Sequence, residues 1–185
     1  MRRFSRLVAL LALLIAAQTG TTLVAAGAPG SGPGSLLVAA PKKLLIGDIR
    51  LNETLMPVGL DKSRRPIVPA HNVGWYIHSA PPGQGDNVVM WGHVLRWRAT
   101  PRIPAAFERL STLKNGAEIK VVLADGKVYR YRVTKTVWAR PSDIQYILPT
   151  GKERLTLVSC IGDKVIVSGR LTKKFRLITI AEPIS

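Results

Sequence analysis

The sequence contains a single cysteine, Cys160, which ends the apolar, β-branched run of residues 155–159. A thiol that has no disulfide partner in its own chain, at the end of a predicted strand, suggests a reactive nucleophile. The alternative is a small apolar core residue, because free cysteine is among the most buried residue types. The thiol needs a partner to act, because an ordinary thiol is mostly protonated at neutral pH and only the thiolate is nucleophilic.

Three histidines could supply that partner. His71 and His78 lie in a segment rich in turn residues, where an ordinary surface histidine is expected. His93 instead follows Gly92 at the end of an apolar predicted strand, and such a strand is the rigid support that a catalytic group needs. We therefore predict that His93 is the partner of Cys160, although a histidine standing alone there would more often be structural.

The elements that position these residues are predicted to be short strands. Apolar or alternating runs bounded by turn residues occur at 44–51, 54–58, 87–93, 118–123, 128–133, 155–160 and 175–180. Asp125-Gly126 predicts a hairpin turn, and only residues 104–110, with Pro104 in the first turn, predict a short helix. This pattern favours an all-β fold, a closed barrel or a sandwich, over an α/β fold.

The N-terminus has the features of an export segment. Arg2, Arg3 and Arg6 precede the unbroken apolar run 7–17, and small residues follow. Residues 1–28 are therefore either a cleaved signal peptide or an N-terminal membrane anchor, and we favour a single-pass anchor over cleaved secretion. Both alternatives place the rest of the chain outside the cytoplasm.

The remainder of the chain divides into a linker and one domain. Residues 29–40 form a Gly/Pro/Ser-rich spacer, and residues 41–185 have the length of one ordinary domain. The formal net charge of +16 favours contact with anionic envelope polymers or lipid headgroups. Nucleic acid is disfavoured because the basic residues are scattered and no binding motif is present.

Three ordered elements resemble a known family. Gly92-His93, then Thr-Leu-Val-Ser-Cys at 156–160, then Arg176 before an apolar run, are similar to the sortases, which are cysteine transpeptidases of the bacterial cell surface. The sortase signature is Thr-Leu-x-Thr-Cys, with a Gly-His strand before it and an arginine that opens the final strand. The resemblance implies a closed barrel of about eight strands with one or two short helices, and is nearest to the compact class E and F type.

The resemblance also assigns roles that agree with the chemistry of the residues. Cys160 would be the nucleophile, and His93 the general acid that protonates the leaving amine. Arg176 would stabilise an oxyanion or the substrate backbone, as a permanently charged donor can. Arg170 is the alternative arginine, but it falls in a predicted loop. No cofactor is implied, and no acidic cluster predicts a calcium or other metal site.

Two positions depart from the family pattern and bear on the substrate site. Ser159 stands where the family usually has threonine, which keeps a hydroxyl group. Trp91 stands where a small residue is usual, and would narrow or reshape the groove if it faces it. The loop 139–154 is the implied groove wall. The predicted substrate-binding residues are Trp91, Val158, Ser159, Ile144, Ile147 and Leu148.

As the resemblance implies, the substrate would be a Leu-Pro-x-Thr-Gly or Leu-Ala-x-Thr-Gly sorting motif, cleaved after Thr through a thioester. A peptidoglycan-precursor or pilin amine would resolve it. The chain's own Leu148-Pro149-Thr150-Gly151 lacks the variable residue, and we interpret it as coincidence. Two alternatives stay open: another cysteine peptidase or L,D-transpeptidase, and a non-catalytic anchored barrel that binds envelope polymers.

Overall fold

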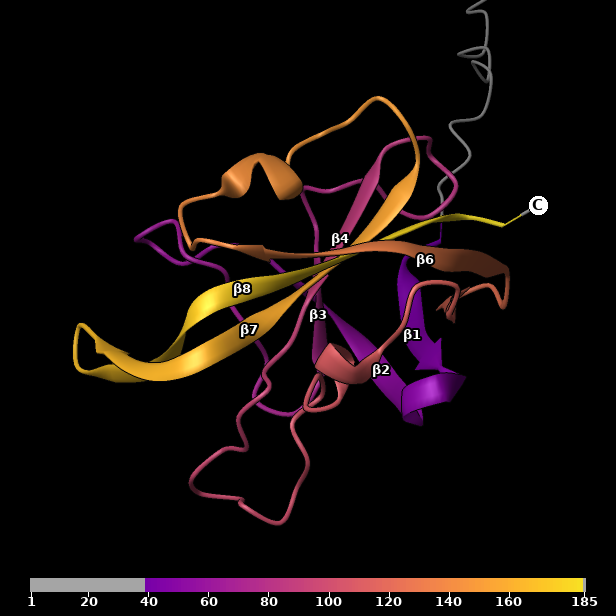
Figure 1. Ribbon diagram of the computed structural model, residues 1–185. Coiled ribbons are helices and arrows are strands. Elements are labelled where there is room, and N and C mark those ends of the chain that lie inside the picture. The colour runs from indigo at the N-terminus through magenta and orange to yellow at the C-terminus, as the bar shows by residue number, and fades with distance from the viewer. Residues whose placement is uncertain (1–38, 185) are drawn as a thin grey trace, which may run out of the picture. The chain divides into compact units, whose positions relative to one another are not determined.

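The computed structural model describes residues 39–184, which form one closed eight-stranded β-barrel (Figure 1). The strand order around the barrel is β1-β2-β3-β4-β7-β8-β6-β5. The all-β closed barrel expected from the sequence is confirmed, whereas the predicted export segment and most of the spacer lie outside the described residues. The strands are β1 (Pro41–Ile46), β2 (Leu51–Val58), β3 (Val73–Tyr76), β4 (Asn87–Trp91), β5 (Glu118–Leu123), β6 (Val128–Ala139), β7 (Arg154–Val167) and β8 (Arg170–Pro183).

The helical content of residues 39–184 consists of three short 3₁₀ helices, η1 (Gly47–Ile49), η2 (Leu110–Thr112) and η3 (Ile144–Tyr146). The helix expected at 104–110 forms as a series of turns that lead into η2. A continuous helix does not form there because the Phe107 N–H donates to the carbonyl of His93, just after β4, at 2.8 Å. No helix within the described range is long and apolar enough to cross a membrane.

The barrel interior is filled by one side of each strand. Along β7, Leu155 and Leu157 are fully buried in the main apolar cluster, together with Leu44, Ile119 and Tyr131 from other strands. Neighbouring residues of a strand point to opposite faces, so Thr156, Val158 and Cys160 share the outer face of β7. A second, smaller cluster on the outside contains Val58, Val89 and Trp91.

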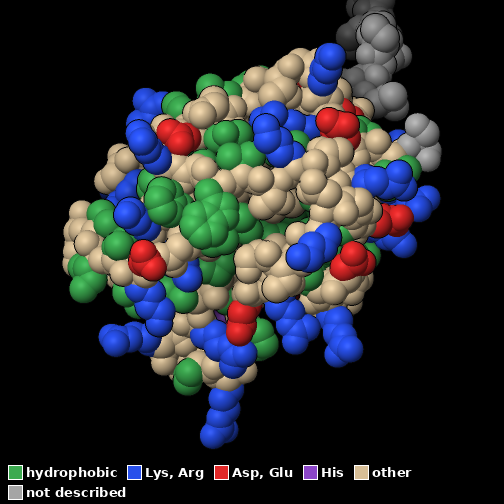
Figure 2. Space-filling view, viewed as in Figure 1, with side chains coloured by type: hydrophobic (Ala, Val, Ile, Leu, Met, Phe, Trp, Pro, Cys, Tyr) green, Lys and Arg blue, Asp and Glu red, His purple; other side chains and the backbone are tan. Residues whose placement is uncertain are grey.

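The surface of the barrel is strongly basic, as the composition predicts. Lys and Arg total 27 against 11 Asp and Glu in the full chain. Figure 2 shows Lys and Arg side chains over the whole of the visible face, with apolar patches between them and few carboxylates. The basic residues are therefore spread over this face and do not form one compact site.

Candidate functional site

The strand register brings Cys160 of β7 and Arg176 of β8 together, and His93 follows the end of β4, which pairs with the other side of β7. β4 and β7 are parallel, with Trp91 opposite Val158, and the Gly92 N–H donates to the Val158 carbonyl at 3.2 Å. Continuing this register by two residues places His93 level with Cys160. On the other side of β7, Cys160 is paired directly with Arg176 of antiparallel β8. The backbone of Cys160 is therefore paired with that of Arg176, and on the other side of β7 the pairing with β4 ends two residues before both His93 and Cys160.

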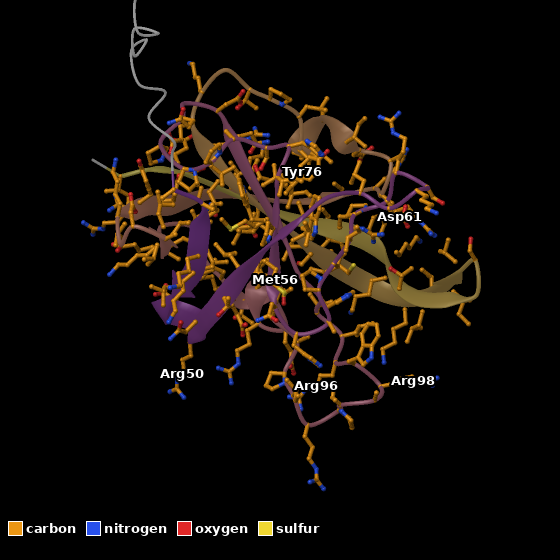
Figure 3. The ribbon with its side chains drawn as sticks, turned by 180° about the vertical axis from the view of Figure 1, so that it is seen from behind. Arg50, Met56, Asp61, Tyr76, Arg96 and Arg98 are labelled. Atoms are coloured by element: carbon orange, nitrogen blue, oxygen red, sulfur yellow. The ribbon has the colours of Figure 1, made fainter. Side chains whose placement is uncertain are left out.

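Gly92 is required by the packing just before His93. A Cβ atom built at this position would lie 2.9 Å from a ring carbon of Phe107, closer than real Cβ contacts. The chain turns away after His93 into the loop 92–109, which projects from the barrel and carries Arg96 and Arg98 (Figure 3). The glycine thus lets β4 end against Phe107, directly before His93.

The thiol of Cys160 is free and partly exposed, outside the apolar clusters of the core. His93 is half-buried, and burial lowers its pKa below the ordinary value for histidine. Contact with the Val68 backbone opposes this shift, whereas the charge of nearby His71 adds to it. Trp97 covers one side of the imidazole, with 6.0 Å between the ring centroids. Cys160 is thus on a partly exposed part of the barrel, and the His93 imidazole is partly shielded from water.

The guanidinium of Arg176 is held by the backbone of its own hairpin. Its Nη1 donates to the carbonyls of Lys173 at 3.1 Å and Phe175 at 3.2 Å. These bonds use one of its three nitrogens, and among residues 39–184 the structure gives no carboxylate partner to the other two. Arg170 does not lie in a loop, as the sequence predicted. It opens β8 and is paired with Val167 at the far end of the hairpin, so its backbone lies well away from Cys160.

Trp91 lies on the same strand face as His93 but leans away from β7. Its Nε1 donates to the Ile67 carbonyl at 2.8 Å, and its ring packs on Tyr76 at 5.0 Å. A Cβ atom at Gly74 would lie 3.0 Å from the same Nε1, so the indole crosses β3 where the side chain is missing. Trp91 therefore fills the β3 side of the groove and leaves the β7 side to Val158 and Cys160.

The predicted contact residues of β7 separate into two faces. Val158 is partly buried in the outer cluster and belongs to the face of Cys160. Ser159 is only 1 % exposed and lies on the opposite, core face, where its Oγ has no hydrogen-bond partner. The structure therefore places the Ser159 side chain behind the groove floor and gives it no direct access to a substrate.

The loop 140–153 between β6 and β7 covers one end of this outer face. Ile147 packs into the outer cluster, whereas Ile144 and Leu148 are exposed at 58 % and 47 %. A pocket of about 310 Å³ lies between this loop and the loop after β3, lined in part by Ile77, His78 and Ile147. Of the three apolar loop residues predicted for substrate binding, Ile147 is the one that reaches the groove floor.

Asn87, which the sequence reasoning missed, fixes this loop to the barrel. Its side chain is 1 % exposed, and its Nδ2 donates to the carbonyls of Tyr146 at 3.0 Å and Leu148 at 2.9 Å. Its Oδ1 accepts from Arg154 at 3.2 Å and Thr156 at 2.7 Å. A polar residue opening an otherwise apolar strand is the signal that could have identified it.

Asp86 gives a structural reason for the Leu148-Pro149-Thr150-Gly151 string. Its Oδ1 accepts hydrogen bonds from the backbone N–H groups of Thr150 and Gly151. The Thr150 bond is the main cause that lowers the pKa of Asp86. Gly151 has a φ of +65°, which favours glycine. The string therefore forms a fixed turn of the loop.

The other two histidines lie off the strand ladder. His71, in the loop after β2, makes a 3.0 Å hydrogen bond between its Nε2 and Thr100 Oγ1. His78 packs edge-on against Tyr76 at 5.4 Å. No group of three or more His, Cys, Asp and Glu side chains that could hold a metal ion occurs in the described part of the chain.

The closed barrel pairs Cys160 of β7 with Arg176 of β8, and His93 follows β4 on the other side of β7. The sortase-domain family model matches residues 46–184, which is well over half of the chain. The chain therefore belongs to the sortase family, and the resemblance found in the sequence is confirmed. Comparison with curated proteins gave no match.

Solved structures give the same fold at low sequence identity. The chain is similar to a lid mutant of sortase A from Corynebacterium diphtheriae, with a TM-score of 0.62 and 21 % identity, covering 79 % of this chain and 70 % of that one. The chain is also similar to sortase C1 from Streptococcus agalactiae, with a TM-score of 0.61 and 21 % identity, covering 84 % of this chain and 72 % of that one. For a Clostridium perfringens sortase D5 transpeptidase the TM-score is 0.57 and the identity 20 %, covering 79 % of each chain.

Proposed function

We propose that this chain is a cysteine transpeptidase that cleaves a Leu-Pro-x-Thr-Gly or Leu-Ala-x-Thr-Gly sorting motif after Thr and joins the Thr carbonyl to an amine. The observation that supports this most is the position of Cys160. It is paired with Arg176 on one side, and on the other side β7 pairs up to Val158 with β4, the strand that leads into His93. Its partial exposure also argues against the inert core cysteine of a non-catalytic barrel.

The proposed reaction divides into two acyl transfers. The Cys160 thiolate attacks the Thr carbonyl carbon, and Arg176 donates to the oxyanion or to the adjacent substrate backbone. The Thr–Gly C–N bond then breaks as the His93 imidazolium gives its proton to the departing glycine amine, which leaves a thioester on Cys160. An incoming amine attacks the thioester and loses a proton to His93, and the new amide is released with the thiolate restored.

The outer face of β7 has a suitable length for this substrate. An extended chain rises about 3.3 Å per residue, so Leu and Thr of the motif, three residues apart, are separated by about 10 Å. Thr156 and Cys160, four residues apart on one strand face, are separated by about 13 Å, which accommodates this span, and Ile147 packs near the Thr156 end. We therefore propose that the motif runs along Val158, with its Leu near Ile147 and its Thr carbonyl at Cys160.

The wider setting follows from the family and the N-terminal sequence. We propose an extracytoplasmic bacterial enzyme, held at the membrane by a signal or anchor in residues 1–28 and a spacer at 29–40, with the catalytic domain from 41 onward. Its partners would be sorting-signal proteins, and a peptidoglycan precursor or a pilin as the amine donor. We also propose the compact class E or F type within the family.

The test is intact-mass analysis of the full chain incubated with Leu-Pro-x-Thr-Gly and Leu-Ala-x-Thr-Gly peptides, with and without an added amine. We expect a thioester adduct on the wild type, absent in Cys160→Ala, and a product joined to the amine when amine is present. Ser159→Ala serves as the matched control, because its hydroxyl lies one residue away on the opposite face. If no peptide gives an adduct and Cys160 resists alkylation until the protein unfolds, the proposal fails.

A further inference from the structure

The long hairpin that follows the candidate site has no partner along its outer half. β7 and β8 continue together beyond Cys160, through the pairs Lys164–Lys173 and Ile166–Leu171, to a turn at Ser168-Gly169. β6 stops pairing with β8 at Arg176, and β4 stops pairing with β7 at Val158, so residues 162–174 form a two-stranded ribbon. Figure 1 shows this ribbon projecting from the barrel.

The end of the ribbon is apolar and exposed. Ile166, Val167 and Leu171 are exposed at 76 %, 57 % and 54 %, and Ile166 is the most exposed large apolar side chain in the described part of the chain. Apolar atoms are visible at this end in Figure 2. Both this ribbon and the β5–β6 hairpin turn through polar or small residues, Ser168-Gly169 and Asp125-Gly126. The ribbon, however, has three exposed large apolar side chains beside its turn, where the β5–β6 hairpin has Val128. Exposed apolar side chains gathered in this way mark an interaction surface.

Basic residues lie directly behind the apolar end. Residues 162–174 contain Lys164, Arg170, Lys173 and Lys174 against the single acid Asp163, which gives 4 − 1 = +3. Lys164 and Lys173 are cross-strand partners, two positions behind Ile166 and Leu171 on the same ribbon face. Like charges directly opposite each other destabilise a strand pair. The Nζ of Lys173 also donates to the Gly162 carbonyl at 3.1 Å, a neutral acceptor that leaves the positive charge of the pair uncompensated.

We propose that the β7–β8 ribbon binds the surface of an anionic lipid bilayer. The two positions from Ile166 to Lys164 correspond to about 7 Å, which matches the depth to which interfacial segments insert. Ile166 and Leu171 would enter the acyl boundary, while Lys164 and Lys173 meet the lipid phosphates. A second copy of this basic chain would place like charges together, and nucleic acid would leave the apolar end in water.

This proposal goes beyond the peptide chemistry and does not depend on it. Because Cys160 and Arg176 lie at the base of the ribbon, docking would hold the thiol at a fixed height of about 20 Å, six strand residues, from the ribbon end. Substrates and amine donors that are attached to the membrane would then reach the thiol over a defined distance.

The test uses the full chain in vesicles and a local probe. In Cys160→Ala, a polarity-sensitive dye is attached at Leu171→Cys or, as the matched control, at Val128→Cys, a 48 % exposed residue on the other hairpin. The protein is reconstituted in phosphatidylglycerol or phosphatidylcholine vesicles that contain spin-labelled lipid. We expect the dye at 171 to shift to the blue and to be quenched in the anionic vesicles, and the dye at 128 to remain in water.

A charge variant keeps the proposal falsifiable. Lys164→Gln/Lys173→Gln is expected to weaken partitioning of the ribbon about 30-fold, the loss expected for two surface lysines, with the circular-dichroism spectrum unchanged. A dye at 171 that stays in water in both vesicle types overturns the proposal. Equal quenching in both lipids overturns the role of the lysines. A blue shift that depends on protein concentration and occurs without lipid quenching overturns the proposal as well, because it shows that the ribbon binds a second copy of the chain.

Discussion

The two faces of β7 carry different kinds of residues on one backbone. The core face presents Leu155 and Leu157, both fully buried, whereas the outer face presents Val158 and Cys160, which are only partly covered. Strand alternation alone separates them, so adjacent residues contribute to stability and to chemistry almost independently. Substitutions on the core face should therefore lower the stability and spare the activity, and substitutions on the outer face should do the reverse.

The largest effect is expected at Cys160. Replacement by alanine removes the proposed nucleophile, and transpeptidation should fall by about 10⁴-fold or more. Because the thiol is partly exposed, the free energy of unfolding should change by about 1 kcal/mol or less. Product formation followed by mass spectrometry, together with urea unfolding, checks both parts. Residual activity near the wild-type level would remove Cys160 from the mechanism.

His93→Gln is expected to have the next largest effect. Loss of a general acid typically costs about 10²- to 10⁴-fold in rate, and glutamine keeps a polar side chain of similar size. His78→Gln is the matched control, because His78 lies in the loop after β3 and is absent from the contacts that shift the pKa of His93. If both variants retain full kcat, the imidazole beside Cys160 has no catalytic role.

The core face should respond in the opposite sense. Leu157→Ala removes a fully buried side chain and should lower the free energy of unfolding by about 2–5 kcal/mol. The activity of the molecules that remain folded should be unchanged. Leu171→Ala, the same substitution at a 54 % exposed position of the same hairpin, should cost about 0.5 kcal/mol or less. Equal losses in both would mean that the ribbon is packed in solution.

The sequence predicted the barrel because its strands depend on local patterns. Alternation and turn residues mark the strands, and Gly92-His93 and Cys160 each end an apolar run. The helix expected at 104–110 was wrong, since its backbone bonds to His93, a contact that local propensity does not contain. The direction of the Trp91 indole likewise depends on the space above Gly74, which only the tertiary structure supplies.

Asn87 was missed because its role also depends on tertiary contacts. Replacing it tests whether its hydrogen bonds hold the loop 140–153 in place. Asn87→Ala leaves two loop carbonyls and the Thr156 hydroxyl without their partner, so the free energy of unfolding should fall by about 1–3 kcal/mol. Since the loop it holds carries Ile147, KM for the peptide should rise more than kcat falls. Asn115→Ala, at an exposed turn position, should change neither quantity.

The smallest effect concerns the charge state of His93. Burial lowers its pKa, so between that value and the ordinary one the unfolded chain binds the proton more readily than the folded chain. Stability from this group is therefore complete above the ordinary histidine pKa and falls as pH decreases through this window. It also means that a smaller fraction of His93 is protonated at neutral pH than in a free histidine.

His71 gives a way to move that equilibrium without touching the thiol. Its charge adds to the lowering, so His71→Gln should raise the pKa of His93 and shift the pH–rate profile in the same direction, whereas His78→Gln should leave both unchanged. NMR titration of the His93 ring proton measures the shift directly. A pKa that moves without any change in the rate profile would show that His93 protonation does not limit turnover, which leaves Cys160 of β7 and Arg176 of β8 as the groups that determine the rate.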